Sequence, residues 1–177
     1  MRIAGFEVER EEGMEIRLMK AGIADADRIH AVQVEAFLPL LDIYQDVETS
    51  PACEGVEMVR ARIMQPVTDY YMVLKQEELV GAIRIRHLGE GAYRVGPVFV
   101  LPKEQNQGLA QKAFQLVESL YPEARIWELD TILEEKRNCH LYEKLGYMQT
   151  GQSESLNERL TLVMYRKEVP GRIQGKI

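Results

Sequence analysis

The feature that most constrains the fold is residues 98–110, which read Val-Phe-Val-Leu-Pro-Lys-Glu-Gln-Asn-Gln-Gly-Leu-Ala. An apolar, β-branched run ends at Pro102, a short polar loop follows, and Gly108 opens a stretch with helical apolar spacing. At such a junction the backbone N–H groups of the loop and of the first helical turn lack intrahelical partners, and the helix dipole adds partial positive charge. The pattern therefore predicts a strand, an anion-binding loop and a helix N-terminus suited to a phosphate-bearing cofactor.

Two common phosphate-binding loops do not match this segment. A P-loop ends in Gly-Lys-Ser/Thr, whereas this loop ends in Gln107-Gly108-Leu109. A dinucleotide fingerprint needs three glycines, and this loop has one. The segment instead resembles motif A of the GNAT superfamily of N-acetyltransferases, Gln/Arg-x-x-Gly-x-Gly/Ala. Its three defined positions are matched by Gln105, Gly108 and Ala110.

A second segment strengthens the resemblance. Residues 138–147 read Asn-Cys-His-Leu-Tyr-Glu-Lys-Leu-Gly-Tyr and are similar to the superfamily helix that ends in Tyr-Glu-Lys-Leu-Gly-Phe/Tyr. Leu141 and Leu145 share one helical face, and Gly146 is a natural end for that helix. Tyr142 taken alone fits equally well as an amphipathic packing residue. The two motifs stand in the superfamily's order, and the resemblance extends from about Glu15 to Arg166.

Length and composition indicate a single globular domain over residues 1–177, with a loose tail from about residue 168. The resemblance implies that this domain is an N-acetyltransferase domain. No apolar run is long enough to cross a membrane, and the first residues lack the pattern of a signal peptide. Cys53 and Cys139 form neither a disulfide framework nor a metal-ligand spacing. We therefore expect a reduced cytoplasmic protein with no metal site and no membrane association.

The distribution of charge bears on the partner. The chain has 22 basic and 28 acidic residues, a net charge of −6, which disfavours nucleic acid. Between His30 and Arg60 there is no lysine or arginine, whereas there are six acidic residues: Glu35, Asp42, Asp46, Glu48, Glu54 and Glu57. Beside a cleft, such a segment would concentrate a cationic amine. On an exposed loop, the same residues would be ordinary solvated charges.

Apolar spacing and turn residues predict the elements along the chain. Pro39 is expected to end the first helix, which starts at Asp25 or Asp27, and residues 40–56 are expected to form a loop. The other expected helices cover 57–64, 109–120 and the segment with Tyr142; the expected strands cover 15–19, 69–75, 79–87, 92–100, 125–130, 147–150 and 160–165. The resulting order, β-α-α-β-β-β-α-β-α-β-β, is an α/β fold with a mixed sheet, as in the GNAT superfamily.

Pro97 lies inside an expected strand, where proline removes a ladder hydrogen bond. Gly96-Pro97 is well suited to a β-bulge. In the GNAT fold this strand carries a bulge and splays from the next parallel strand. The resemblance implies that the freed backbone groups pair with the pantetheine amides of the cofactor.

The resemblance implies that the co-substrate is acetyl-CoA or another short acyl-CoA. Pantetheine would run along Val98, Phe99 and Val100, and the pyrophosphate would contact the backbone of Gln105, Asn106, Gln107, Gly108, Leu109 and Ala110. Asn138 would contact the cofactor in place of the asparagine that many members carry at the position of Glu135.

An amine would attack the thioester directly. A backbone N–H near Phe99 or Val100 would stabilise the oxyanion, and Tyr142 would protonate the leaving thiolate.

The general base stays open. Many relatives place a glutamate on the strand before motif A, but residues 93–100 contain no carboxylate. The alternatives are Glu35, Glu128, Asp130 or a water chain.

The missing carboxylate also favours a rival function, a non-catalytic acyl-CoA sensor of the same fold. A second rival is an acyl-CoA enzyme with a hydroxyl acceptor. For an N-acetyltransferase, the acceptor would be an amine of a small molecule or peptide, and the acidic segment favours a cationic one such as a polyamine, an aminoglycoside or a basic peptide end. The superfamily also makes a homodimer a reasonable expectation.

Overall fold

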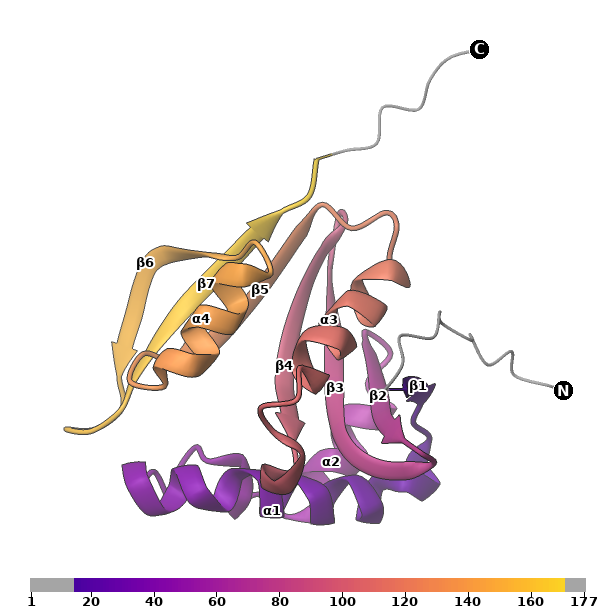
Figure 1. Ribbon diagram of the computed structural model, residues 1–177, viewed down its shortest axis with the longest axis horizontal. Coiled ribbons are helices and arrows are strands. Elements are labelled where there is room, and N and C mark those ends of the chain that lie inside the picture. The colour runs from indigo at the N-terminus through magenta and orange to yellow at the C-terminus, as the bar shows by residue number, and fades with distance from the viewer. Residues whose placement is uncertain (1–14, 171–177) are drawn as a thin grey trace, which may run out of the picture.

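The computed structural model describes residues 15–170 and contains a mixed sheet with strand order β1-β2-β3-β4-β5-β7-β6 (Figure 1). The strands are β1 (Ile16–Lys20), β2 (Thr68–Lys75), β3 (Glu78–Gly89), β4 (Ala92–Val100), β5 (Ile126–Ile132), β6 (Met148–Ser155) and β7 (Thr161–Glu168). Neighbouring strands pair antiparallel except β4 and β5, which pair parallel. The expected order of strands and helices is confirmed.

The helices cover both faces of the sheet. They are α1 (Ala26–Tyr44), α2 (Val56–Met64), α3 (Leu109–Ser119) and α4 (Lys136–Lys144), with short 3-10 turns at Ile23–Asp25, Pro51–Cys53 and Pro102–Glu104. Helices α1 and α2 pack on one face, where Ile29 and Val59 are fully buried. Helices α3 and α4 pack on the other, where Phe114 and Tyr142 join the larger core. Each face thus has its own apolar core.

The first helix is longer than the sequence predicted. Pro39 does not end α1, which continues to Tyr44, so the prediction of a loop from residue 40 was wrong for its first turn. Proline removes one intrahelical N–H, but the next turn is retained because Tyr44 is buried. The helix ends at Gln45, which adopts a left-handed conformation and donates its N–H to the Leu41 carbonyl.

Two contacts complete the sheet. Arg84 on β3 is buried and donates to the Gln65 side chain at 2.7 Å. Glu168 belongs to β7, and Val169 donates its N–H to the Arg125 carbonyl. Residues 171–177 lie outside the described part of the chain.

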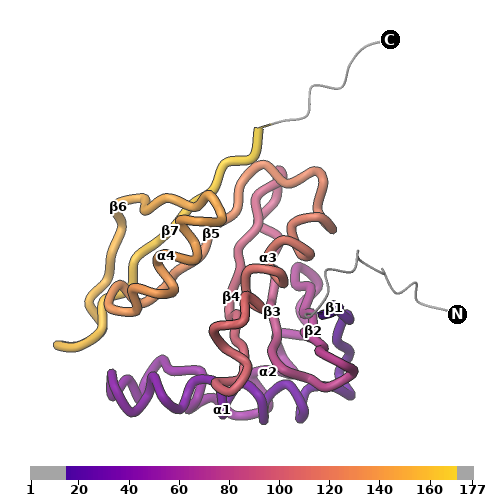
Figure 2. Tube along the Cα trace, viewed as in Figure 1, coloured from indigo at the N-terminus to yellow at the C-terminus, as the bar shows by residue number. Residues whose placement is uncertain are grey.

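The pairing of β4 with β5 is short. It joins only Ala92–Arg94 to Ile126–Glu128, and beyond these positions the two strands diverge toward α1 (Figures 1 and 2). On its other edge β4 stays paired with β3, with a register shift because Ile83 faces Val98 while Ile85 faces Val95. Gly96 and Pro97 together lie opposite the single residue Arg84, so the predicted bulge and splay are both confirmed.

A hydrogen-bonded cluster ties β1, β2 and β3 to the end of α3. Asp69 accepts a hydrogen bond from the Tyr121 hydroxyl at 2.7 Å, lies 2.7 Å from His87 Nε2, and pairs with Lys20. Burial alone would raise the pKa of the Asp69 carboxyl, but the bonds from Lys20, Tyr121 and His87 lower this pKa to about 2.

We expect Asp69→Asn to lower the free energy of unfolding by about 1–2 kcal/mol at pH 7. The carboxylate is more acidic in the folded state, so its contribution is complete above pH 3.8 and is lost as the pH falls toward about 2. Urea unfolding of both proteins at several pH values should therefore show the difference shrinking below pH 4. The control is Asp27→Asn, because Asp27 is 72% exposed in its ion pair with Arg60. A difference that does not change with pH would contradict the assignment.

Candidate active site

The loop before α3 presents backbone N–H groups to solvent. Gly108 is the N-cap of α3 and adopts a left-handed conformation with φ 76°, as does Asn106 with φ 64°. Leu109 is buried and fixes the first turn of the helix against the core. Gln105 reaches back and donates from Nε2 to the Val100 carbonyl at 3.0 Å. The predicted sequence of strand, loop and helix N-terminus is therefore present.

Three adjoining cavities lead away from this loop. The loop cavity, about 320 Å³, lies between residues 104–111 and α4, and its lining includes Arg137 and Lys144. The strand cavity, about 260 Å³, is lined by β4, α1, α3 and α4. The leucine cavity, about 230 Å³, is lined by α1, β5 and the segments around β6 and β7, and contains Leu40, Leu41, Leu156, Leu160 and Leu162.

Shared lining residues show that the cavities follow one another. Gln105 and Ala110 line both the loop cavity and the strand cavity. Val98 and Tyr142 line both the strand cavity and the leucine cavity. Asn138 lines all three. One path therefore runs from the helix N-terminus, along the splayed edge of β4, to the space beyond Tyr142.

Tyr142 stands at the passage between the last two cavities. Its side chain is 6% exposed and packs edge-on against Phe114, with ring centroids 5.5 Å apart. Burial raises the pKa of the Tyr142 hydroxyl above its usual value, so the phenol is protonated at neutral pH. Within residues 15–170 this hydroxyl has no hydrogen-bond partner, and neither does the side chain of Asn138. Both groups are available to a ligand.

Most of the predicted site residues lie along this path. Those that line its cavities are Val98, Phe99, Val100, Gln105, Asn106, Gly108, Leu109, Ala110, Asn138 and Tyr142. The Gln107 side chain lines none of the three, because its Oε1 accepts a hydrogen bond from Lys75 Nζ at 2.9 Å.

The candidate bases are separated by the fold. Asp130 lines the leucine cavity and pairs with Arg94. Glu128 lines none of the three cavities, and its Oε2 lies 3.8 Å from the same arginine. Glu35 is exposed on α1 and also lines none of them. Of these three carboxylates, only Asp130 is placed to meet an acceptor.

The acidic segment between His30 and Arg60 does not face the path as a group. Glu54 makes two hydrogen bonds to Arg62, at 2.6 and 2.7 Å, and Glu57 pairs with Arg60. Only Asp46 of the six lines any of the three cavities. The interpretation as surface charge fits most of the segment.

Sequence reasoning missed a contact between α1 and α4. The Tyr44 hydroxyl donates to Glu135 Oε1 at 2.5 Å, which joins the end of α1 to the start of α4. Tyr44 lines the leucine cavity and Glu135 the strand cavity. Tyr44 follows Phe37 by two helical turns, a signal that was discarded when Pro39 was taken as the end of the helix.

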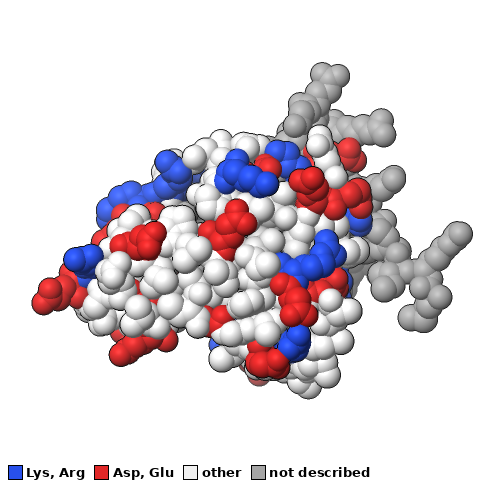
Figure 3. Space-filling view, turned by 90° about the horizontal axis from the view of Figure 1, so that it is seen from below, with Lys and Arg blue, Asp and Glu red and all other residues white. Residues whose placement is uncertain are grey.

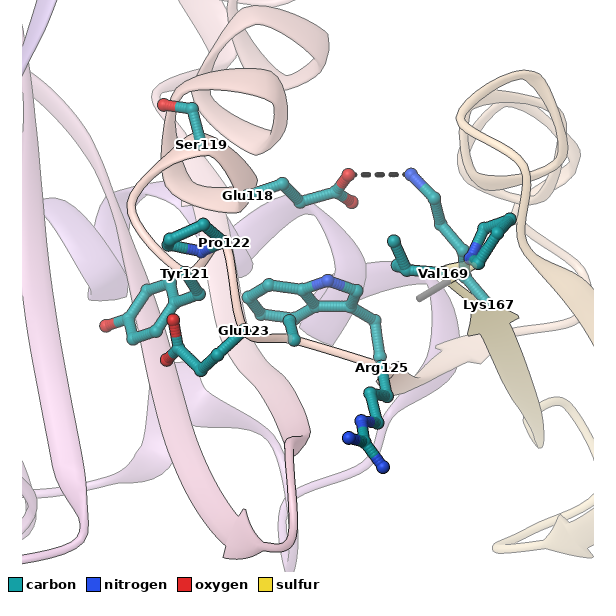
Figure 4. A pocket seen from close by; sticks show the side chains of 11 residues that line it. Glu118, Ser119, Tyr121, Pro122, Glu123, Arg125, Lys167 and Val169 are labelled. Carbon is teal, nitrogen blue, oxygen red and sulfur yellow. Dashed lines mark hydrogen bonds and ion pairs between the residues drawn. The ribbon is translucent and has the colours of Figure 1, made fainter. Parts of the chain in front are cut away.

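A larger cavity, about 930 Å³, lies away from this path, between the end of α3 and the ends of β5 and β7 (Figure 4). Two of its polar side chains, Glu118 and Lys167, pair with each other at 2.6 Å (Figure 4). None of the predicted site residues lines it. It carries no part of the candidate site.

Comparison with known proteins identifies the family to which this protein belongs. Residues 38–147, more than half of the chain, match the model of the acetyltransferase (GNAT) family. The protein belongs to this family. It is also 28% identical, over 116 residues, to the uncharacterized protein YrkN of Bacillus subtilis, a match that spans 64% of this chain and 62% of that protein.

Solved structures share the fold at low identity. They include a spermidine N-acetyltransferase from Vibrio cholerae in complex with CoA and spermine (TM-score 0.69, 17% identity, 86% of this chain and 95% of that one). A Salmonella typhimurium acetyltransferase that modifies the N-terminal serine of ribosomal protein L7/L12 has a TM-score of 0.70 and 17% identity, over 87% of this chain and 95% of that one. The PaiA N-acetyltransferase of Thermoplasma acidophilum in complex with coenzyme A has a TM-score of 0.68 and 13% identity, over 88% of this chain and 100% of that one.

Residues 15–170 lack two further features. No group of three or more His, Cys, Asp or Glu side chains in this part of the chain could hold a metal ion. No described helix is long and apolar enough to cross a membrane.

The position of β4 beside the strand cavity depends on a close approach of β3. A Cβ added to Gly81 would lie 2.3 Å from the Phe99 carbonyl oxygen. We expect Gly81→Ala to push the two strands apart and lower the free energy of unfolding by about 1–3 kcal/mol, measured by urea unfolding. Gly55→Ala is the control, because a Cβ there meets nothing within 4 Å. Equal stabilities of the two variants would show that this approach is not required.

Proposed function

We propose that this chain is a single N-acetyltransferase domain that moves an acyl group from acetyl-CoA, or another short acyl-CoA, to an amine. The observation that carries this proposal is the path of three cavities, which begins at an exposed helix N-terminus and passes Tyr142. Its three parts suit the phosphates, the pantetheine arm and the acceptor in turn. The CoA complexes of structures with the same fold support the choice of cofactor.

The loop cavity has the charge that the phosphates need. Backbone N–H groups of residues 105–110 lie at the positive end of the α3 dipole. Arg137 and Lys144 add two cations to the lining. The carboxylate in this lining, Glu104, is already paired with Lys75 at 2.7 Å. A pyrophosphate would meet net positive charge here.

The free edge of β4 suits the pantetheine amides. Leu101 donates its N–H to the Val80 carbonyl, so alternation along an antiparallel ladder turns the backbone groups of Val100 and Val98 away from β3. The bond from Gln105 to the Val100 carbonyl agrees with this direction. The backbone N–H and carbonyl of Phe99 point toward β3 instead. Of the two candidate oxyanion donors, this favours the N–H of Val100.

The reaction we propose has no acyl-enzyme. The amine nitrogen forms a bond to the thioester carbonyl carbon, and the carbon–sulfur bond breaks. The amine proton passes to Asp130 or to water, and Tyr142 protonates the leaving thiolate, giving an amide and free CoA. Asp130 is engaged in an ion pair with Arg94, so a water relay stays as an alternative.

A non-catalytic acyl-CoA-binding protein is the second candidate function. The observation that favours it is the composition of β4 (Ala92–Val100), which has no carboxylate facing the acceptor. The position and protonation of Tyr142 favour the enzyme.

We expect acetyl-CoA at about 100 times its Kd to add about 2.7 kcal/mol to stability, a rise in Tm of roughly 5–10 °C. Gly108→Asp should abolish this rise, because it places a carboxylate where the phosphates would lie. Differential scanning fluorimetry with CoA, acetyl-CoA and ATP measures it. Gly89→Asp is the control, since Gly89 is also exposed with a positive φ of 92° but lies at the end of β3, away from the loop before α3. No rise with either CoA species would refute CoA binding.

Tyr142→Phe separates the two candidate functions. For the enzyme, we expect the rate of acyl transfer to fall by about 10²–10⁴-fold while the Tm rise with acetyl-CoA is unchanged. CoA release and amide formation measure the rate. Tyr147→Phe is the control, because it removes a nearby buried hydroxyl that binds Glu118 and lines none of the three cavities. Turnover that survives in Tyr142→Phe would remove Tyr142 from the mechanism.

A further inference from the structure

The leucine cavity is apolar over most of its wall. Helix α1 contributes Phe37, Leu40 and Leu41, and the segments around β6 and β7 contribute Leu156, Leu160 and Leu162. On the side where α1 lies, charged side chains surround a broad area without Lys, Arg, Asp or Glu (Figure 3). An acceptor that enters this cavity loses water over an apolar surface.

The two carboxylates in the lining are already engaged. Asp46 accepts hydrogen bonds from both the N–H and the hydroxyl of Thr49. Asp130 is paired with Arg94. Asp46 bonds only to the neutral Thr49 and keeps its charge, so it can meet one further ammonium group, but a polycation would have to bury at least one more without an unpaired carboxylate, which is costly.

Two hydroxyls in the lining are not engaged. Thr131 is 7% exposed on β5, and among the described residues its hydroxyl has no hydrogen-bond partner. The Tyr142 hydroxyl likewise has no hydrogen-bond partner among the described residues, and Tyr142 also borders the strand cavity. Both residues line the cavity, so their hydroxyls are available to bond a polar group of the ligand. One polar end and one apolar body are what the cavity can accommodate.

We infer that the acceptor is a primary amine on one compact apolar body rather than a polycation. The amine would lie at Tyr142 and Thr131, where it reaches the thioester, and the body would lie against the leucines. The cavity of about 230 Å³ is smaller than most ligand sites, which run from about 300 Å³, and so requires a small acceptor. This inference rests on the proposed function and narrows it away from polyamines and aminoglycosides.

The test compares 2-phenylethylamine with spermidine and with a lysine-rich peptide as acceptors for acetyl-CoA. We expect kcat/KM for 2-phenylethylamine to exceed that for spermidine at least tenfold. Binding of 2-phenylethylamine is measured separately by calorimetry, with and without CoA, so that the site is tested apart from turnover.

Leu41→Asp places a carboxylate in the cavity from a half-buried position on α1. This substitution should lower both the affinity for 2-phenylethylamine and its kcat/KM at least tenfold. The preference for 2-phenylethylamine over spermidine should become smaller or reverse. Leu38→Asp is the matched control, because Leu38 is on the same helix, 45% exposed and outside the cavity. An unchanged Tm rise with acetyl-CoA shows that each variant is folded.

The outcomes separate the two proposals. Preference for spermidine or the peptide, with CoA bound and turned over, would overturn the inference and leave the proposed function intact. Binding of 2-phenylethylamine that Leu41→Asp weakens, without any transfer, would support the cavity assignment and refute the transferase. If 2-phenylethylamine is neither bound nor acetylated, the inference is overturned.

Discussion

The short parallel pairing of β4 with β5 is the constraint on which the rest of the structure depends. Only three residue pairs join the two strands. At that end they are held by side chains, since Tyr93 packs on Trp127 with ring centroids 5.1 Å apart and Arg94 reaches toward Glu128. Beyond Arg94 the bulge at Gly96 and Pro97 turns β4 away. An edge without a partner strand is left inside the sheet, and α1 and α4 form a cavity over it.

A free edge of this kind normally attracts another strand. Here the side chains of the loop and of the flanking helices occupy its surroundings. Gln105 binds the Val100 carbonyl, and the contact between Tyr44 and Glu135 closes α1 onto α4. The edge is thus accessible to a slender ligand through the loop cavity. A cofactor with amide groups along a flexible arm matches such an edge better than a folded chain does.

Much of the fold could be predicted because its signals are local. The strand, loop and helix around Gly108 follow one another in the sequence, and the bulge needs only Gly96-Pro97. What failed required distant residues. Whether α1 continues past Pro39 depends on the burial of Tyr44 and its bond to Glu135, 91 positions away. The burial of Arg84 also depends on a distant residue, because Gln65 Oε1 accepts a hydrogen bond from the Arg84 guanidinium. Two acids of the segment, Glu57 and Glu54, are paired with Arg60 and Arg62 on α2, which only the folded structure shows. Thr131 gave no signal, since a strand threonine shows its role only through the cavity it lines.

The charge along the path has a physical consequence. Arg137 and Lys144 stand at one end, while no lysine or arginine lines the leucine cavity at the other. An anionic cofactor would therefore be drawn to the loop, and in the proposed binding mode its thioester end would extend toward the mostly apolar wall of the leucine cavity. An amine that enters from the leucine side must give up its proton in those apolar surroundings, which favour the neutral form of the amine. The wall that selects an apolar body would also assist deprotonation, and this reduces the need for the carboxylate that β4 lacks.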